Sequence, residues 1–220
     1  MLHHLYQNVR YAIKVIIKRE IVSLIPEFEL GLWNAWIFWL YFVLAIVPNM
    51  LIYRYIWKDD SKKAMDRLYT DISPNKTEKR LKYIGYPVMV ALIIYSVFLP
   101  LKLDTAWFYV GLLIYLLGVI FTIMADLSFA TTPLDKPVTK WVYRISRNPQ
   151  DFGAFLIMMG MGIAGASWLF LLFLMILIIL SNRGAIAEER FCLEKYGDAY
   201  REYMNSTPRW IGIPKSQEKE

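Results

Sequence analysis

Four long stretches without a charged side chain are the feature that most limits the folds open to this chain. They span 33–53, 83–101, 106–125 and 152–182. About twenty helical residues cross roughly 30 Å of hydrocarbon, where no water is present to hydrogen-bond an irregular backbone. The sequence therefore predicts an all-α fold, a polytopic integral membrane bundle.

The last uncharged stretch is too long for one crossing. Near its middle lies Gly162-Ile163-Ala164-Gly165-Ala166-Ser167-Trp168, where small residues and a serine favour a turn and the tryptophan suits the membrane interface. We therefore predict two short helices here, about 152–165 and 167–183. The expected number of membrane helices rises to about five.

The positive residues predict an orientation, because lysine and arginine in short loops are retained in the cytoplasm. With five crossings, 20 of the 25 fall on one side, in segments 54–82, 128–151 and 183–220. We therefore expect an active site facing the cytoplasm. The net charge of +6 suits membrane lipids as partners, and no basic-aromatic module outside the spans favours nucleic acid.

An amphipathic pattern occupies residues 2–24, with apolar side chains on one helical face and Arg10, Lys14 and Lys18 on the other. This pattern predicts an interfacial helix. We expect it outside, because an inside position would export the positive charges of the 54–82 loop.

Three regions follow from this organisation. The N-terminal amphipathic segment is 1–32, the first three membrane helices lie in 33–125, and the remaining loop, helical hairpin and cytoplasmic helix lie in 126–215. The mixed-charge loop 54–82 is expected to be a solvated surface. Segment 128–148 is the candidate ligand loop, because loops of about twenty residues in a compact protein are uncommon unless functional.

A stripe of bulky residues predicts that the last membrane helix continues into the cytoplasm. Its members recur at spacings of three and four and so share one helical face. They are Glu189, Leu193, Tyr196, Tyr200 and Tyr203. We expect this face to pack under the membrane region, with Gly197 allowing a break.

Three motifs follow one another in the last third of the chain. They are Arg147-Asn148-Pro149-Gln150-Asp151-Phe152-Gly153, then Glu188-Glu189, then Tyr196-Gly197-Asp198-Ala199-Tyr200 with Tyr203 and Pro208-Arg209. This order resembles the isoprenylcysteine carboxyl methyltransferase family and its phospholipid N-methyltransferase relatives. The resemblance covers about 126–215.

The resemblance implies S-adenosylmethionine as cofactor, enclosed between the loop and the acid pair. A carboxylate pair can bind its ammonium or ribose hydroxyls, and an arginine can bind its carboxylate. The implied cofactor-binding residues are Val138, Tyr143, Arg144, Arg147, Asn148, Gly153, Glu188 and Glu189. The spacing alone favours a solvated helix face for the acid pair, beside Arg183 and Arg190, whereas the hairpin and the Asn-Pro segment favour a ligand site.

The chain departs from the family pattern at two positions. Asn148 stands where the family has histidine, and Asp151 stands where it has tyrosine. Asp151 either binds a cationic head group or caps the helix that follows it. Asp151 and Arg147 are the candidate catalytic residues.

The scarcity of histidine and cysteine limits the chemistry further. His3, His4 and Cys192 are the only residues of these types, so we expect no metal site and no serine-histidine-acid triad. Methyl transfer from a sulfonium mainly requires alignment and exclusion of water, so it needs no histidine base. We expect a lipophilic small molecule or lipid as substrate.

Two other function classes stay open from the sequence. Segment 190–197 also resembles the C-terminal region of membrane sterol reductases, which would make the chain an NADPH-dependent reductase. A non-enzymatic scaffold or transporter is the other alternative. The clustering of ionisable groups in loops on one side, and not inside the spans, argues against a transporter.

Overall fold

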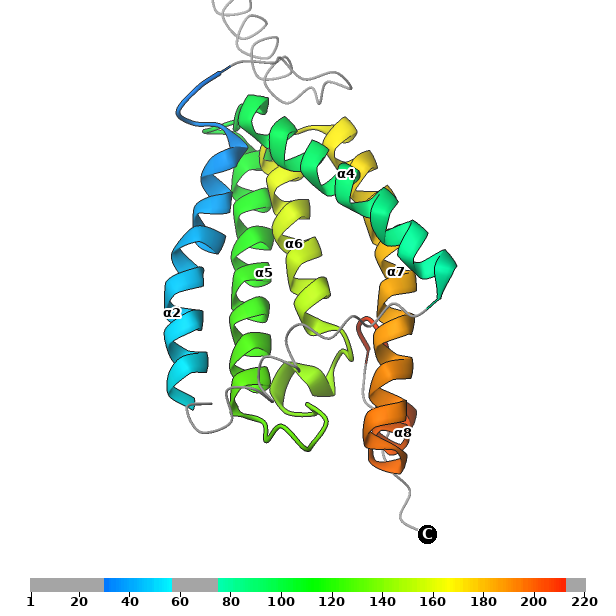
Figure 1. Ribbon diagram of the computed structural model, residues 1–220. Helices are drawn as coiled ribbons and strands as arrows, with labels where there is room; N and C mark the ends of the chain where they lie inside the picture. Colours follow the sequence, from blue (N-terminus) through cyan, green and yellow to red (C-terminus); the bar gives the residue numbers. More distant parts are fainter. Residues whose placement is uncertain (1–29, 57–74, 213–220) are drawn as a thin grey trace, which may run out of the picture.

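The computed structural model describes residues 30–56 and 75–212, and its regular structure there is entirely helical (Figure 1). The all-α prediction is therefore confirmed for this part of the chain. The interfacial helix predicted at 2–24 lies outside the described residues. The elements are η1 (Ala35–Trp39), α2 (Leu40–Ile56), α4 (Lys76–Phe98), α5 (Ala106–Thr131), η2 (Trp141–Arg144), α6 (Pro149–Ala164), α7 (Trp168–Tyr196) and α8 (Asp198–Ser206).

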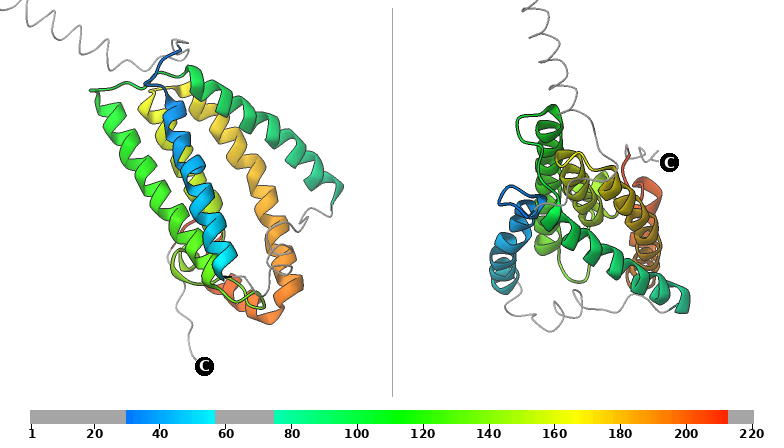
Figure 2. Two further views of the ribbon diagram at one scale, coloured as in Figure 1. Left: turned by 60° about the vertical axis from the view of Figure 1, so that its left-hand side comes forward. Right: turned by 90° about the horizontal axis from the view of Figure 1, so that it is seen from above.

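Three of these helices, α4, α5 and α7, are long and apolar enough to cross a membrane. The prediction of an integral membrane protein is thereby supported, whereas the count of five crossings stays a prediction. In Figure 1, α2, α5, α6 and α7 run along a similar direction and α4 is inclined to them. Figure 2 shows α4 beside α7, on the side of the bundle away from the lower end of α2.

Several helix boundaries differ from the predicted ones. Helix α4 begins at Lys76, before the uncharged stretch 83–101, because the Asn75 side chain caps it by accepting from Thr77 N at 3.1 Å. Helix α5 continues to Thr131, beyond the predicted end at 125. Helix α7 continues past 183 to Tyr196 without a break, which confirms the predicted extension. The charged residues at these ends are therefore helical.

The predicted turn in the long apolar stretch is present between α6 and α7. Ala166 adopts φ 49°, and Ser167 N donates to Gly162 O at 2.9 Å. The Ser167 hydroxyl caps α7 by accepting from Phe170 N at 3.2 Å, and it also lies 2.9 Å from the Tyr95 hydroxyl of α4. The hairpin is thus tied to α4 at its closed end.

Glycines bring α5 and α6 into close backbone contact. A Cβ at Gly111 of α5 would lie 2.4 Å from Ala164 N, and one at Gly160 of α6 would lie 2.6 Å from Gly111 O. Further along, a Cβ at Gly153 would lie 2.4 Å from Thr122 Oγ1. Small residues allow such approach between membrane helices. This contact fixes α6, and with it the Asn-Pro segment from which α6 begins.

The end of α2, the connection from α5 to α6, and α8 all lie at the same end of the bundle (Figure 1). The predicted topology requires this arrangement, because it assigns all three to one side of the membrane.

We predict that Gly111→Ala lowers the thermal stability of the protein in detergent, because the added methyl group meets backbone atoms of α6. Overpacking of this kind typically costs about 1–3 kcal/mol. Gly85→Ala in α4 is the matched control, since no atom lies within 4 Å of its added Cβ. The control should melt at or slightly above the wild-type temperature. Equal melting temperatures of the two variants would contradict the packing account.

Candidate functional site

A buried carboxylate below the membrane helices joins three segments of the chain. Glu189 is 3% exposed, and its Oε1 accepts from Arg147 Nε at 3.1 Å and from Arg209 Nε at 2.9 Å. Its Oε2 accepts from Arg209 Nη2 at 2.8 Å. The Asn148 amide also donates to Oε1, at 3.4 Å. We call these four residues the Glu189 cluster.

Backbone hydrogen bonds bring the C-terminal segment alongside the loop. Arg147 N donates to Pro208 O at 3.0 Å, and Asn148 N donates to Arg209 O at 3.2 Å. Gly212 N donates to Ile145 O at 3.2 Å in the same contact. The loop before α6 is therefore held both by side-chain ion pairs and by main-chain pairing.

Helix α8 packs against η2 through its tyrosines. The break that separates it from α7 lies at Gly197, whose φ is 57°. Tyr203 donates from its hydroxyl to Tyr143 O at 2.6 Å, and its ring lies 5.6 Å from that of Tyr200. The predicted stripe of bulky residues thus packs under the membrane region, although it is divided between two helices.

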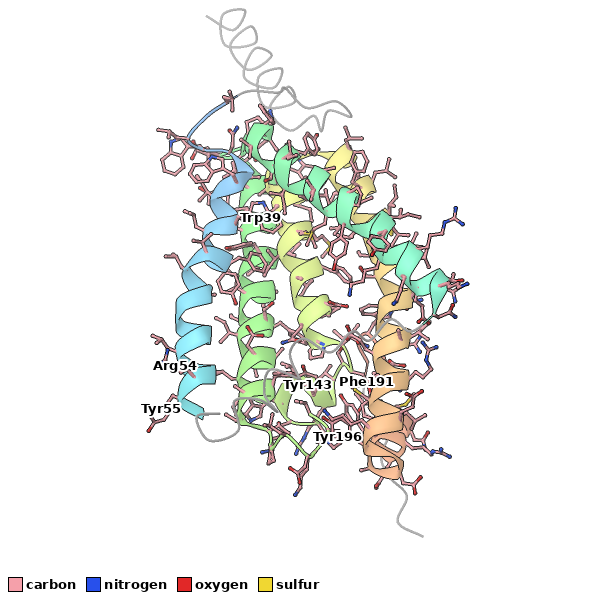
Figure 3. The ribbon with its side chains drawn as sticks, viewed as in Figure 1. Trp39, Arg54, Tyr55, Tyr143, Phe191 and Tyr196 are labelled. Carbon is pink, nitrogen blue, oxygen red and sulfur yellow. The ribbon has the colours of Figure 1, made fainter. Side chains whose placement is uncertain are left out.

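These contacts border a cavity of about 190 Å³ between the loop, α7 and α8, which we call the α8 cavity. Its walls combine aromatic rings with carboxylate, guanidinium, amide and ammonium groups. Figure 3 shows Tyr143, Phe191 and Tyr196 at this end of the bundle. The lining residues are Phe129, Pro137, Val138, Tyr143, Arg147, Asn148, Pro149, Gln150, Asp151, Glu188, Phe191, Cys192, Lys195, Tyr196, Tyr200 and Tyr203.

Most of the predicted site residues are brought together at this cavity. Those that line it are Val138, Tyr143, Arg147, Asn148, Asp151 and Glu188. Three others do not line it. Glu189 is held in its ion cluster, Gly153 packs against α5, and Arg144 lines a separate groove with residues of α8.

The structure therefore separates the two members of the acid pair. Glu188 faces the cavity and is exposed there, whereas Glu189 points into the buried cluster. Adjacent residues of a helix are about 100° apart around its axis, so two neighbouring carboxylates reach different surroundings.

Both cavity carboxylates lie beyond the uncharged parts of α6 and α7. Protein atoms surround Glu188 on most sides even though it faces the cavity, and this burial raises its pKa to about 7. Repulsion from Asp151 and Glu189 adds to the rise, and Lys82 opposes it. Burial likewise raises the pKa of Asp151. A cation in the cavity would favour the ionised form of both groups.

Several residues that line the cavity were not predicted as site residues from the sequence. Phe191, Cys192 and Lys195 lie three, four and seven positions after Glu188, so they share its helical face. Spacings of three and four residues, counted from Glu189, predicted the packing stripe. The same spacings counted from Glu188 would have identified these three residues.

One comparison with known proteins gives a match. A family model described as phospholipid methyltransferase matches residues 88–199, just over half of the chain. The matched range contains α5, α6, α7 and the loop, and it ends before Tyr200 and Arg209. No curated protein and no solved structure matches the chain.

We predict that Glu189→Gln destabilises the protein strongly, because it leaves two guanidinium groups without their shared carboxylate. Breaking a buried ion pair costs about 3–5 kcal/mol, and the lower end applies here because the Arg209 side chain is 32% exposed. The neighbouring change Glu188→Gln is the control and should not lower the stability, because burial makes the ionised Glu188 carboxylate costly and the amide carries no charge. Thermal unfolding in detergent measures both. If the two variants lose equal stability, the proposed division of the acid pair is wrong.

Proposed function

The chain belongs to the phospholipid methyltransferase family, and we propose that it transfers a methyl group from S-adenosylmethionine to a lipophilic acceptor at the membrane surface. The observation that carries this proposal is the cavity between the loop, α7 and α8. It lies largely within the region that matches the family, and acidic, basic and aromatic groups line it together.

The groups at the cavity suit the chemistry of the proposed cofactor. The Glu188 carboxylate complements its ammonium or its ribose hydroxyls. Arg147 uses Nε and Nη2 for Glu189 and Nη1 for Met204 O, and the guanidinium retains further N–H donors for an anionic group. Val138, Tyr143 and Tyr200 offer apolar and aromatic surface for a flat base.

When bound, S-adenosylmethionine supplies an electrophilic methyl group on a positively charged sulfur. The protein would contribute alignment of the reacting atoms and exclusion of water. The Glu189 cluster supports this role, because it holds the loop and α7 at a fixed separation around the cavity. Tyr200 and Tyr203 form part of the wall and are both buried.

The exposed apolar faces of the membrane helices favour an acceptor that arrives from the bilayer. Ile94 of α4, Leu113 of α5 and Ile179 of α7 are 55%, 60% and 64% exposed. Such surfaces suit contact with lipid chains. We therefore propose a lipid or lipophilic small molecule as the acceptor.

We further propose that the cavity faces the cytoplasm, because the connection from α5 to α6 belongs to the positively charged side. In a Cys192→Ser background, a cysteine introduced by Asp135→Cys should resist an impermeant thiol reagent in intact cells. Leu103→Cys, at the other end of the bundle, is the control and should react. The reverse pattern would place the cavity on the opposite side.

We predict that S-adenosylhomocysteine, the demethylated product, stabilises the purified protein, by about 2.7 kcal/mol at a concentration of 100 Kd. Glu188→Gln should weaken its binding by about 1.5–3 kcal/mol, because a charged hydrogen bond is lost. Asp198→Asn, on the exposed start of α8, is the control and should bind normally. Calorimetry in detergent gives the affinities. Stabilisation by NADPH and not by S-adenosylhomocysteine would favour a reductase and overturn the proposal.

A further inference from the structure

A second cavity, of about 350 Å³, lies between α4 and α7. Its walls combine aliphatic side chains with charged groups, among them Glu78 at the start of α4. From α4 and α7 they include Leu81, Lys82, Met89, Leu177, Leu180 and Glu188, and Asp151 is the residue from α6.

Two residues line both this cavity and the one beside α8. They are Asp151 and Glu188. The two spaces therefore meet at a pair of carboxylates, one at the start of α6 and the other on α7. A group bound in the α4–α7 cavity with its polar end at Asp151 would border directly on a ligand beside Glu188.

Asp151 is the third residue of α6, where an acidic side chain often caps the helix by accepting from the N-cap backbone N–H. Here Asn148 N donates instead to Ser146 Oγ at 3.1 Å and to Arg209 O at 3.2 Å. Within 30–56 and 75–212, the Asp151 carboxylate accepts no hydrogen bond and forms no ion pair. The alternative that Asp151 is a helix cap therefore has no contact to support it.

A carboxylate that is largely enclosed and has no partner is costly to ionise, and a cationic ligand removes this cost. Burial also raises the pKa of Asp151, which makes the carboxylate a better proton acceptor once it is ionised. The apolar walls of α4 and α7 favour the tail of an amphiphile. The exposed Lys82 at the charged end suits an anionic group of the same ligand.

We propose that Asp151 binds the methyl acceptor, an amphiphile whose ammonium head group lies against this carboxylate in the α4–α7 cavity. Asp151 also takes the proton that the nitrogen must lose before methylation. The inference rests on the proposed function, because the methyl donor must be bound in the α8 cavity. It assigns selectivity for an amine to Asp151 at the start of α6.

An N–H bond of the ammonium breaks, its proton passes to the Asp151 carboxylate, and the nitrogen keeps the electron pair. That pair forms the new C–N bond while the C–S bond of the sulfonium donor breaks and leaves its electrons on sulfur. The products are a methylated ammonium and a neutral thioether, and the proton on Asp151 leaves to water.

The test measures lipid binding without cofactor, with the purified full chain in detergent. The probes are dihexanoyl phosphatidylethanolamine, which carries an amine, and dihexanoyl phosphatidylglycerol, which has the same chains and phosphate but no amine. The wild type should bind the amine lipid at least about tenfold more tightly. Asp151→Asn should reduce this preference to less than about threefold, and detectable binding of S-adenosylhomocysteine by the variant shows that it folds.

Two further variants sharpen the result. Asp151→Glu keeps the charge and should keep the preference for the amine lipid, and Asp198→Asn makes the same chemical change at an exposed position and should change nothing. The inference is overturned if the wild type shows no preference, if Asp151→Asn retains it, or if Asp151→Asn does not fold. Absence of S-adenosylhomocysteine binding by the wild type would overturn the proposed function itself.

Discussion

The contact on which the site depends is the buried ion cluster of Glu189 with Arg147 and Arg209. It joins the loop before α6, the C-terminal part of α7 and the segment after α8. Because one carboxylate compensates two guanidinium groups in a poorly solvated place, the three segments cannot separate without exposing unpaired charge. The close contact of α5 with α6 then fixes the loop relative to the membrane helices. Together these contacts hold the α8 cavity open beside Asp151 and Glu188.

Two ligand spaces that meet at charged groups suit transfer between a polar donor and an amphiphilic acceptor. Charged groups line both cavities, but the α8 cavity adds four tyrosines, whereas the α4–α7 cavity adds leucine and methionine side chains. The tyrosines suit the flat base of the cofactor, and the aliphatic side chains suit the tail of a lipid. A single pocket open to water would not separate the two in this way, and it would let water compete at the reacting atoms.

Much of the fold could be predicted because the hydrophobic pattern determines it locally. The uncharged stretches predicted the helices, and the small residues with Ser167 predicted the turn between α6 and α7. The different roles of Glu188 and Glu189 could not be predicted, because they depend on Arg147 and Arg209, which come from distant parts of the chain. The α4–α7 cavity has no sequence signal either, since it arises from how two separate helices cross.

The central claim is that donor and acceptor occupy the two cavities and meet at Asp151 and Glu188. An experimental structure with S-adenosylhomocysteine and a short-chain amine lipid tests it most directly. The account predicts density for the thioether ligand between Glu188 and Tyr200, and density for the lipid between α4 and α7 with its nitrogen at Asp151. Thioether density at a place remote from Glu188, or a lipid head group on the far side of the bundle from α4 and α7, would contradict it.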